Sequence, residues 1–183
     1  GSLYMVPETQ AVGQVRLYVC DSFPMEWRFV GTCLDGLAAV DSIVFEHSGR
    51  WWLLCGLPVA SGGPRDVALH IFYSSSPLSS SWESHALNPV LVDNANARNG
   101  GILFDKGRLP IRVRQSQGFD QYGSAFSLAR ISELSTTTYE EVEVDRITFE
   151  DEVEIHGAHH LSRTEGVVVT DFLMMSSTDS VSP

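Results

Sequence analysis

The sequence predicts an all-β protein, and within that class a β-propeller of four-stranded blades. Composition is the first reason, since 43% of the 183 residues are hydrophobic and only 19% are charged. This balance is typical of strands joined by short loops of small residues, because surface helices would need a charged face. The second reason is an internal repeat.

The repeat consists of a strand, a turn of small residues and an aromatic residue: VRLYVCDSFPMEW, ALHIFYSSSPLSSSW and AFSLARISELSTTTY. The aromatic residues Trp27, Trp82 and Tyr139 are 55 and 57 residues apart, and a hairpin lies downstream of each. Four strands per unit of this length are typical of a propeller blade. A β-sandwich with recurring strands is the alternative, but the matching turns Gly49-Arg50 and Gly107-Arg108 favour the propeller.

Counting the expected strands gives two complete blades and two partial ones. Closed propellers usually have four or more blades, so we expect either an incomplete ring or one completed by oligomerisation. Exposed sheet edges then favour a homo-oligomer. We expect residues 3–175 to form a single propeller-like domain, Gly1-Ser2 to be a cloning remnant, and residues 176–183 to be a flexible tail.

The net charge and the cysteine content of the chain argue against some classes of partner and cofactor. The formal net charge of −11 would repel nucleic acid and acidic membrane surfaces, so neither is an expected partner. Three cysteines at irregular spacing match no zinc or iron–sulfur pattern and fit core residues in a reducing compartment. No apolar stretch approaches the roughly 18 residues of a spanning helix. We therefore expect a cytoplasmic protein without a cofactor or metal.

The prediction of a site starts from one hairpin, AVDSIVFEHSGRWWLLCG (residues 39–56). Its second strand is a continuous apolar run and should be buried on both faces. Asp41 lies just before the first strand, where a buried carboxylate needs a partner, a ligand or solvent. The alternative is that Asp41 caps a turn through backbone N–H groups.

Several pieces together resemble one family: LYMVPET, LY…FPMEW, AVDSIVFEHSGRWWLLCG, ARNGGILFDKGRLPIRVRQ and GAHHL. They are similar to the five-bladed propeller at the N-terminus of glucosamine inositolphosphorylceramide transferases and beside some bacterial formyltransferase-like proteins. The resemblance implies a fold like that of glycoside hydrolase families 43 and 32. The family's first blade, and the first strand of its second, have no counterpart here. In the related hydrolases that first blade carries one essential acid.

Innermost propeller strands line a central channel, so their entrance residues should converge. Asp41 is one such residue, and Glu8 is the only other acid that we nominate for a catalytic pair. The candidate ligand-binding residues are Arg98, Asn99, Gly100, Arg112, His159 and His160. An acid, a guanidinium and two imidazoles suit a sugar or polyol, and Gly100-Gly101 would let a ligand approach the backbone.

These residues favour a module that binds carbohydrate, or another small polar ligand, without turnover. Glycoside hydrolysis needs two carboxylates roughly 5 to 9.5 Å apart, so weak hydrolase activity through Asp41 and Glu8 is one alternative. A truncated propeller that acts as an assembly or scaffold unit is the other.

Two further clusters invite a functional interpretation. His156, His159 and His160 would need a bend in the strand to bind one metal ion together. The segment YEEVEVDRITFEDEVEI (residues 139–155) carries eight acids. Its alternation predicts an outer strand with Val142 and Val144 on one face and solvated acids, including Glu141 and Glu143, on the other.

Overall fold

The protein is all-β, as predicted, and the described residues contain, besides strands, one 3-10 turn, η1 (Gln10–Val12). The computed structural model describes residues 1–60, 67–93, 95–105, 109–117, 123–149, 155–164 and 166–174. The chain divides into two compact units, residues 1–93 with 135–139 and residues 94–134 with 140–183. The part of the chain that the structure describes contains no helix long and apolar enough to cross a membrane.

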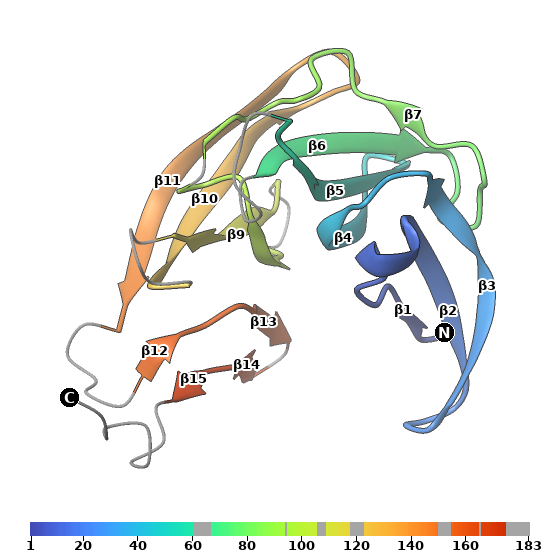
Figure 1. The fold of residues 1–183 in the computed structure, drawn as a ribbon, viewed down its shortest axis with the longest axis horizontal. Coiled ribbons are helices and arrows are strands. Elements are labelled where there is room, and N and C mark those ends of the chain that lie inside the picture. The colour runs from blue at the N-terminus through green and yellow to red at the C-terminus, as the bar shows by residue number, and fades with distance from the viewer. Residues whose placement is uncertain are drawn as a thin grey trace. The chain divides into compact units, whose positions relative to one another are not determined.

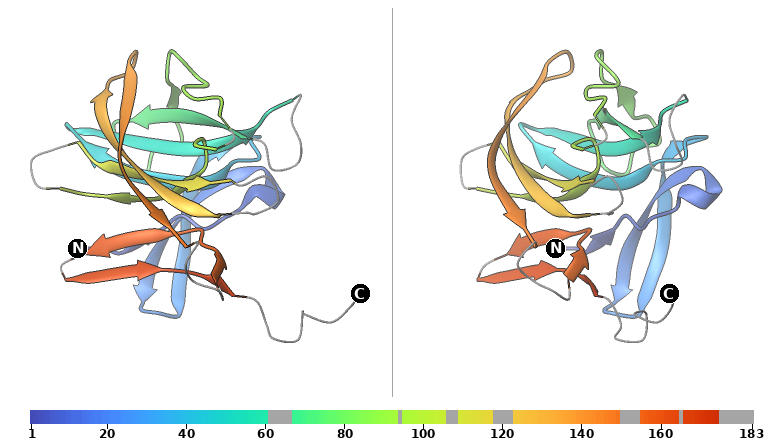
Figure 2. Two further views of the ribbon diagram at one scale, coloured as in Figure 1. Left: turned by 90° about the vertical axis from the view of Figure 1, so that its left-hand side faces the viewer. Right: turned by 60° about the vertical axis from the view of Figure 1, so that its left-hand side comes forward.

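The first unit contains two antiparallel sheets whose neighbouring strands are consecutive in sequence (Figures 1 and 2). The three-stranded sheet has the order β1 (Tyr4–Met5), β2 (Gln14–Ser22), β3 (Glu26–Asp35). The four-stranded sheet has the order β4 (Val40–His47), β5 (Arg50–Pro58), β6 (Val67–Ser74), β7 (Glu83–Ser84). This second sheet has the form predicted for a complete blade.

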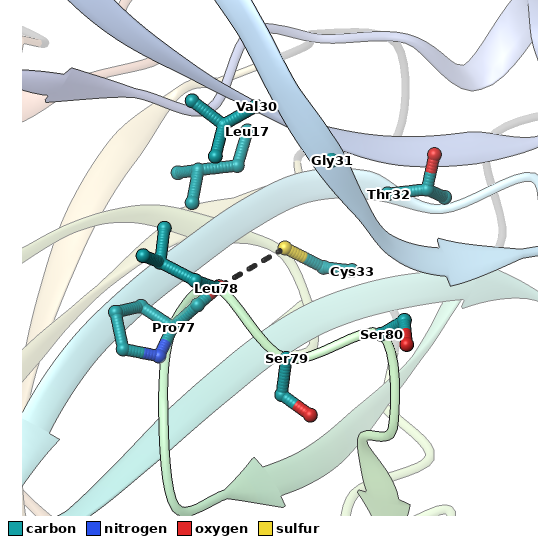
Figure 3. Close-up of a pocket in the computed structure, with 9 residues that line it drawn as sticks. All are labelled: Leu17, Val30, Gly31, Thr32, Cys33, Pro77, Leu78, Ser79 and Ser80. Atoms are coloured by element: carbon teal, nitrogen blue, oxygen red, sulfur yellow. Dashed lines mark hydrogen bonds between the residues drawn. The ribbon is translucent and has the colours of Figure 1, made fainter.

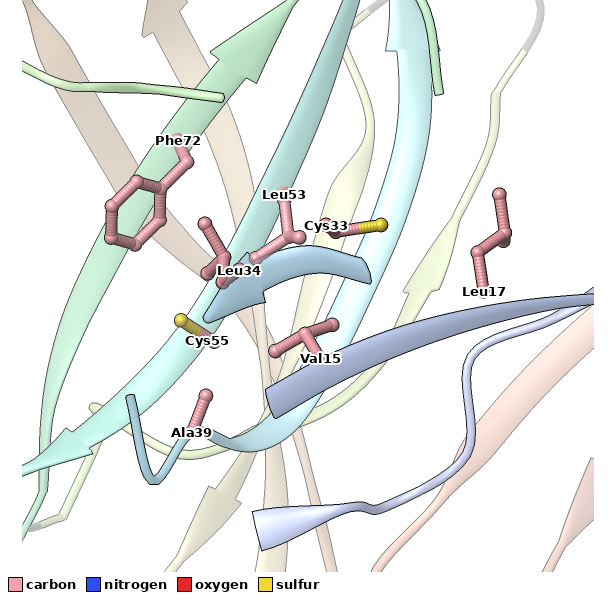
Figure 4. Close-up of a cluster of buried hydrophobic side chains, with 8 residues drawn as sticks. All are labelled: Val15, Leu17, Cys33, Leu34, Ala39, Leu53, Cys55 and Phe72. Atoms are coloured by element: carbon pink, nitrogen blue, oxygen red, sulfur yellow. The ribbon is translucent and has the colours of Figure 1, made fainter. Parts of the chain in front are cut away.

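The two sheets of this unit pack together through one apolar core (Figure 4). The buried side chains are Val15, Leu17, Cys33, Leu34, Ala39, Leu53, Cys55 and Phe72. Leu53, Leu54 and Cys55 are consecutive on β5 and all fully buried, which confirms the predicted burial of this strand on both faces. Burying an apolar side chain of this size contributes about 1.5–3 kcal/mol.

The turn between β4 and β5 accounts for an unusual backbone conformation at Ser48. His47 pairs with Arg50, and the two residues between them, Ser48 and Gly49, have φ values of +53° and +71°. A two-residue hairpin loop of type I′ requires positive φ at both positions. The turn predicted at Gly49-Arg50 is therefore present, whereas Gly107-Arg108 lies outside the described residues.

The second unit contains one four-stranded sheet and two strand pairs. The sheet has the order β11 (Tyr139–Thr148), β10 (Ala125–Leu134), β9 (Ile111–Ser116), β8 (Asn99–Leu103). The pairs are β12 (Ile155–Gly157) with β15 (Leu173–Met174), and β13 (Leu161–Thr164) with β14 (Val167–Thr170). A core of Leu103, Val113, Phe126, Ala158 and Leu161 joins the sheet to the 158–161 segment.

The predicted repeat corresponds to real positions in the sheets. Trp27 and Tyr139 lie at the start of β3 and β11, and Trp82 directly precedes β7. Each of these strands is the last in its sheet. The described residues thus form two four-stranded sheets as predicted, while the number of blades, ring closure, the 3–175 domain and the homo-oligomer stay predictions. The tail predicted at 176–183 lies outside the described residues.

The predicted orientation of β11 is wrong. Val142 and Val144 are the exposed residues, at 60% and 49%, whereas Glu141 is almost buried. Glu141 accepts two hydrogen bonds from the fully buried Arg112 of β9, from Nε at 2.9 Å and from Nη2 at 2.6 Å. Glu143 also accepts hydrogen bonds from Arg114 and Ser127, but its side chain is 46% exposed, as predicted for this residue. Buried guanidinium groups on β9 therefore turn the acids of β11 toward the sheet.

Two glycines of β8 allow the 159–161 segment to approach closely. A Cβ atom on Gly100 would lie 3.2 Å from the carbonyl oxygen of His159, and one on Gly101 would overlap that of Leu161. Gly101 also has a φ of +137°, which L-residues rarely adopt. The space predicted for a ligand beside these glycines is thus occupied by the chain's own backbone.

We predict that Arg112→Ala lowers the free energy of unfolding by about 3–5 kcal/mol, because it removes both short hydrogen bonds to the buried Glu141 carboxylate, whose longer contact with Arg114 at 3.5 Å remains. Arg28→Ala is the matched control, since the Arg28–Asp21 pair is exposed and such pairs contribute at most about 1 kcal/mol. Urea unfolding of the full chain measures both. The double replacement Arg112→Met with Glu141→Leu should recover part of the loss, because it removes the buried carboxylate but also the Arg112 hydrogen bonds to Asn99 and to the Asn96 carbonyl. Equal losses for Arg112→Ala and Arg28→Ala would contradict this role.

We also predict that Gly101→Ala destabilises the protein more than Gly49→Ala does. Gly49 has positive φ, and a methyl group added there would meet open space, so its substitution carries only the backbone cost of about 1–2 kcal/mol. Gly101→Ala adds a steric overlap with the Leu161 carbonyl. Thermal unfolding of the two variants compares them, and an equal loss would show that the 159–161 segment moves away without cost.

Candidate functional site

The first candidate group lies at an irregularity in the pairing of β4 with β5. Val40 pairs with Gly56 and Ile43 with Leu54, so the register shifts across Asp41 and Ser42. Bulges of this kind re-aim side chains and are frequent beside active sites. Asp41 is half-buried and has a φ of +53°.

Glu8, from the segment after β1, lies against Asp41. Its Oε2 atom accepts the backbone N–H of Asp41 at 3.1 Å. The structure therefore brings together the two acids that the sequence nominated as a pair. One oxygen of Glu8 holds the main chain of Asp41, and this contact supports its unusual backbone conformation.

The pKa of Cys55, which lies on the neighbouring strand β5, reflects the negative charge of this group. Burial raises the pKa of its thiol to about 12, with a further contribution from the nearby carboxylates of Asp41 and Glu8. The thiol is therefore protonated at neutral pH and unreactive as a nucleophile. The same negative field favours cationic or hydrogen-donating groups next to Asp41.

The second candidate group lies in the other unit, where β8 meets β9. Gln115 links the two strands, because its backbone N–H donates to the Arg98 carbonyl at 3.1 Å and its Nε2 donates to the Asn99 carbonyl at 2.7 Å. Arg98 and Asn99 are both buried. The Asn99 side-chain oxygen accepts a hydrogen bond from Nη1 of Arg112 at 3.1 Å, so Asn99 and Arg112 join one polar network with Glu141.

Asp171 organises the two predicted histidines, and sequence reasoning missed it. Its Oδ1 accepts the backbone N–H groups of His159 at 2.9 Å and of His160 at 2.6 Å. Its Oδ2 lies 3.0 Å from Nδ1 of His159. Burial raises the pKa of Asp171, but these hydrogen bonds outweigh it and lower the pKa below its ordinary value. Asp171 is thus an ionised anchor at neutral pH.

The sequence of the hairpin that follows the histidines contains a feature from which the contact of Asp171 could have been predicted. β13 pairs with β14 in the register Leu161 with Thr170. The residue before β13 and the residue after β14 are therefore neighbours, and these are His160 and Asp171. Finding this contact from sequence requires the hairpin register, which the valine run of β14 leaves undetermined.

The predicted residues thus form two groups. Asp41 and Glu8 lie together in the first unit, and Arg98, Asn99, Gly100, Arg112, His159 and His160 lie in the second, around β8 and the 159–160 segment. Among the described residues, no three or more His, Cys, Asp or Glu side chains are placed to hold a metal ion. The groups offer carboxylates, an oriented imidazole and amide groups, which is the chemistry of hydroxyl and amine recognition.

Comparison with known proteins identifies the relatives of this chain. Residues 1–173 match the family described as glucosamine inositolphosphorylceramide transferase 1, N-terminal. The chain is 36% identical over 146 residues to glucosamine inositolphosphorylceramide transferase 1 of Arabidopsis thaliana, covering 79% of this chain and 19% of that protein. The rice protein of the same name (Oryza sativa subsp. japonica) is 34% identical over 146 residues, with 78% and 19% covered. The chain therefore spans about a fifth of the length of these curated relatives.

Among solved structures, the fold is similar to the GH32 beta-fructofuranosidase BmSUC1 of Bombyx mori, with a TM-score of 0.54 and 11% sequence identity. The match covers 91% of this chain and 38% of the enzyme. This likeness supports the propeller-type fold and says nothing of shared chemistry. The family match over residues 1–173 confirms the resemblance stated from the sequence, and the chain belongs to the family of the N-terminal region of glucosamine inositolphosphorylceramide transferase 1.

Proposed function

We propose that this domain binds carbohydrate without turning it over, through the group around Asp41. The observation that carries this proposal is the backbone of Asp41. Positive φ in residues other than glycine is uncommon and concentrates at functional positions. Of the two such residues described, Ser48 is explained by its hairpin turn, whereas Asp41 lies at a strand bulge that no turn requires.

The contacts of Asp41 favour binding over hydrolysis. In glycoside hydrolysis one carboxyl group donates a proton while the second acts as nucleophile or base. Here Glu8, the second acid of the group, uses one oxygen to hold the main-chain N–H of Asp41. We infer that Glu8 positions Asp41, and that Asp41 accepts hydrogen bonds from ligand hydroxyl or ammonium groups.

The names of the relatives favour one class of sugar as the ligand. The plant proteins are named as transferases of glucosamine and inositolphosphorylceramide, and the structural neighbour is named as a fructofuranosidase. Because two carboxylates create a negative field that contributes to the raised Cys55 pKa, an aminosugar with a free ammonium group suits the group around Asp41 better than a neutral or acidic sugar. Glucosamine is therefore the ligand that we propose.

The histidine group lies in the other unit and is a separate candidate for contact with a polar ligand. Asp171 fixes the ring of His159 through Nδ1 and fixes the backbone of both histidines. Orientation of an imidazole by a carboxylate at Nδ1 is the usual way of presenting its other nitrogen in one direction. We infer that His159 contacts a ligand and that Asp171 is its positioning residue.

The first test is a titration of the full chain with glucosamine, N-acetylglucosamine and glucuronate, followed by calorimetry and by the rise in melting temperature that binding produces. We expect glucosamine to bind most tightly. Asp41→Asn should weaken its binding at least tenfold, since a hydrogen bond to a charged group contributes about 1.5–3 kcal/mol. The backbone conformation is retained, because Asn tolerates positive φ as Asp does.

Ser48→Gly is the matched control for that titration. It relieves the other positive-φ position, which lies in the hairpin turn, and should leave glucosamine binding unchanged. If none of the three sugars shifts the melting temperature, the domain is instead a scaffold unit. Release of sugar from a p-nitrophenyl glycoside, abolished in Glu8→Gln and Asp41→Asn, would show a hydrolase and overturn binding without turnover.

A second prediction concerns Asp171. Because its pKa is lower in the folded state than its ordinary value of 3.8, ionised Asp171 stabilises the fold at pH values above 3.8, and this contribution disappears as the pH falls through the lower folded-state pKa. Asp171→Asn should therefore be less stable than the parent at pH 7 and differ less from it as the pH falls below 3.8. Urea unfolding across this range measures the difference, and a difference independent of pH would contradict the anchoring role.

A further inference from the structure

A pocket in the first unit lies between β3 and the loop that follows β6 (Figure 3). It has a volume of about 160 Å³ and is partly open to solvent. Its lining comes from three segments: Leu17 of β2, residues 30–33 of β3, and residues 77–80 of the loop. None of these residues belongs to the group around Asp41, so the pocket is a separate feature.

Two bulges in β3 give the pocket its apolar wall. In the pairing with β2, Leu17 faces Gly31 while Tyr18 faces Phe29, so Val30 is an extra residue in the ladder. Cys33 is extra in the same way, between Thr32 and Leu34. A bulge re-aims the side chains of the strand that carries it. Val30 and Cys33 therefore lie on the pocket side with Leu17, as Figure 3 shows.

The opposite wall is a loop fixed by its own serines. The Ser76 hydroxyl accepts the N–H of Leu78 at 3.2 Å, and the Ser79 hydroxyl accepts the N–H of Ser81 at 2.9 Å. Local hydrogen bonds of this kind define a turn. They hold Leu78 at the mouth of the pocket, where this residue is 55% exposed. An apolar occupant would remove this leucine from water.

The lining carries no charge. Its single titratable group is the Cys33 thiol, and burial raises the pKa of that thiol to about 11, so it is protonated at neutral pH. Transfer of an ion into such surroundings is strongly unfavourable without a partner of opposite charge. Hydroxyl groups of Thr32, Ser79 and Ser80 are the polar side chains in the lining.

Gly31 leaves room on the pocket side of β3. Glycine inside a strand destabilises it by about 0.5–1 kcal/mol relative to alanine, and it often marks positive φ, a bulge or a close neighbour. Gly56 and Gly100 have such neighbours, because a Cβ atom added to them would lie 3.0 and 3.2 Å from the nearest atom. Gly31 has neither positive φ nor any atom within 4 Å of that position. Gly31 lies between the bulged residues Val30 and Cys33, and its missing side chain leaves space in the pocket that a ligand can fill.

We propose that this pocket binds a small uncharged molecule that has an apolar ring or branched alkyl group of about six carbon atoms and one hydroxyl group. The volume supports this size, because an apolar cavity of about 150 Å³ accommodates benzene. The ring lies against Leu17, Val30 and Leu78 and covers Gly31. Its hydroxyl group meets the serine and threonine hydroxyls. The carbohydrate proposal involves other residues, so either proposal can fail alone.

Three ligands with the same six-membered carbon ring test this proposal: cyclohexanol, myo-inositol and cyclohexanecarboxylate. Each is titrated into the isotopically labelled full chain and followed by the NMR shifts of the backbone amides. We expect cyclohexanol to shift the amides of Gly31 and Thr32 and to slow alkylation of Cys33. Myo-inositol and the carboxylate should bind at least tenfold more weakly, because the hydroxyl groups of Thr32, Ser79 and Ser80 cannot pair every hydroxyl group of myo-inositol and the lining offers no counter-charge for the carboxylate.

Gly31→Leu places a side chain in the pocket without backbone strain, and we expect it to abolish cyclohexanol binding while the melting temperature holds or rises. Phe29→Leu, outside the pocket lining on the same strand, is the matched control and should bind as the parent does. If Gly31→Leu does not fold, Leu78→Ser at the exposed mouth should weaken binding several-fold. Equal binding of cyclohexanol and myo-inositol, or unchanged binding in both pocket variants, would overturn the proposal.

Discussion

Burial of the middle strands is the constraint on which both units depend. A strand flanked on both sides by other strands, and covered on both faces, must carry either apolar side chains or polar ones whose partners are also buried. β5 carries apolar side chains, because its consecutive residues Leu53, Leu54 and Cys55 are fully buried. β9 instead carries polar side chains with buried partners. Arg112 is fully buried there and pairs with Glu141 across the sheet.

The buried arginine side chains of β9 determine the orientation of β11. Alternation in a strand separates two sets of residues but does not say which set faces inward. Hydrophobicity alone would place Val142 and Val144 inside, yet both are exposed because the guanidinium groups of β9 need the carboxylates of Glu141 and Glu143. Breaking such a pair costs more than exposing two valines, since an unpaired buried charge is worse than exposed apolar surface.

The sequence predicted the features that follow from local patterns, and it could not predict those that follow from register. Strand positions, the turn at Ser48-Gly49 and the burial of β5 are set by alternation, turn residues and apolar runs, and all three are present. Glu8, which was nominated beside Asp41 as a second acid, accepts a hydrogen bond from the Asp41 backbone, and a catalytic role for the two acids stays a prediction. Asp171 was missed because its contact with His160 exists only in one hairpin register. The glycines at 100 and 101 were assigned to a ligand because a close approach of backbone by backbone leaves the same sequence signal.

Irregular pairing connects the two places where we infer binding. In a regular ladder, the residues at positions 33 and 34 would face opposite sides, and Asp41 would have extended backbone. The bulges in β3 and β4 break that rule. Those in β3 place the apolar side chains of Val30 and Cys33 on the same side as Leu17, whereas the bulge in β4 holds the carboxylate-bearing residue Asp41 beside Glu8. Each bulge forgoes ladder hydrogen bonds, so it persists only where the rest of the sheet is well packed. The shared apolar core of Leu53, Cys55 and Phe72 supplies that packing. Two further members of this core, Leu17 and Cys33, also line the pocket, so the core supports the pocket directly and the group around Asp41 through β5.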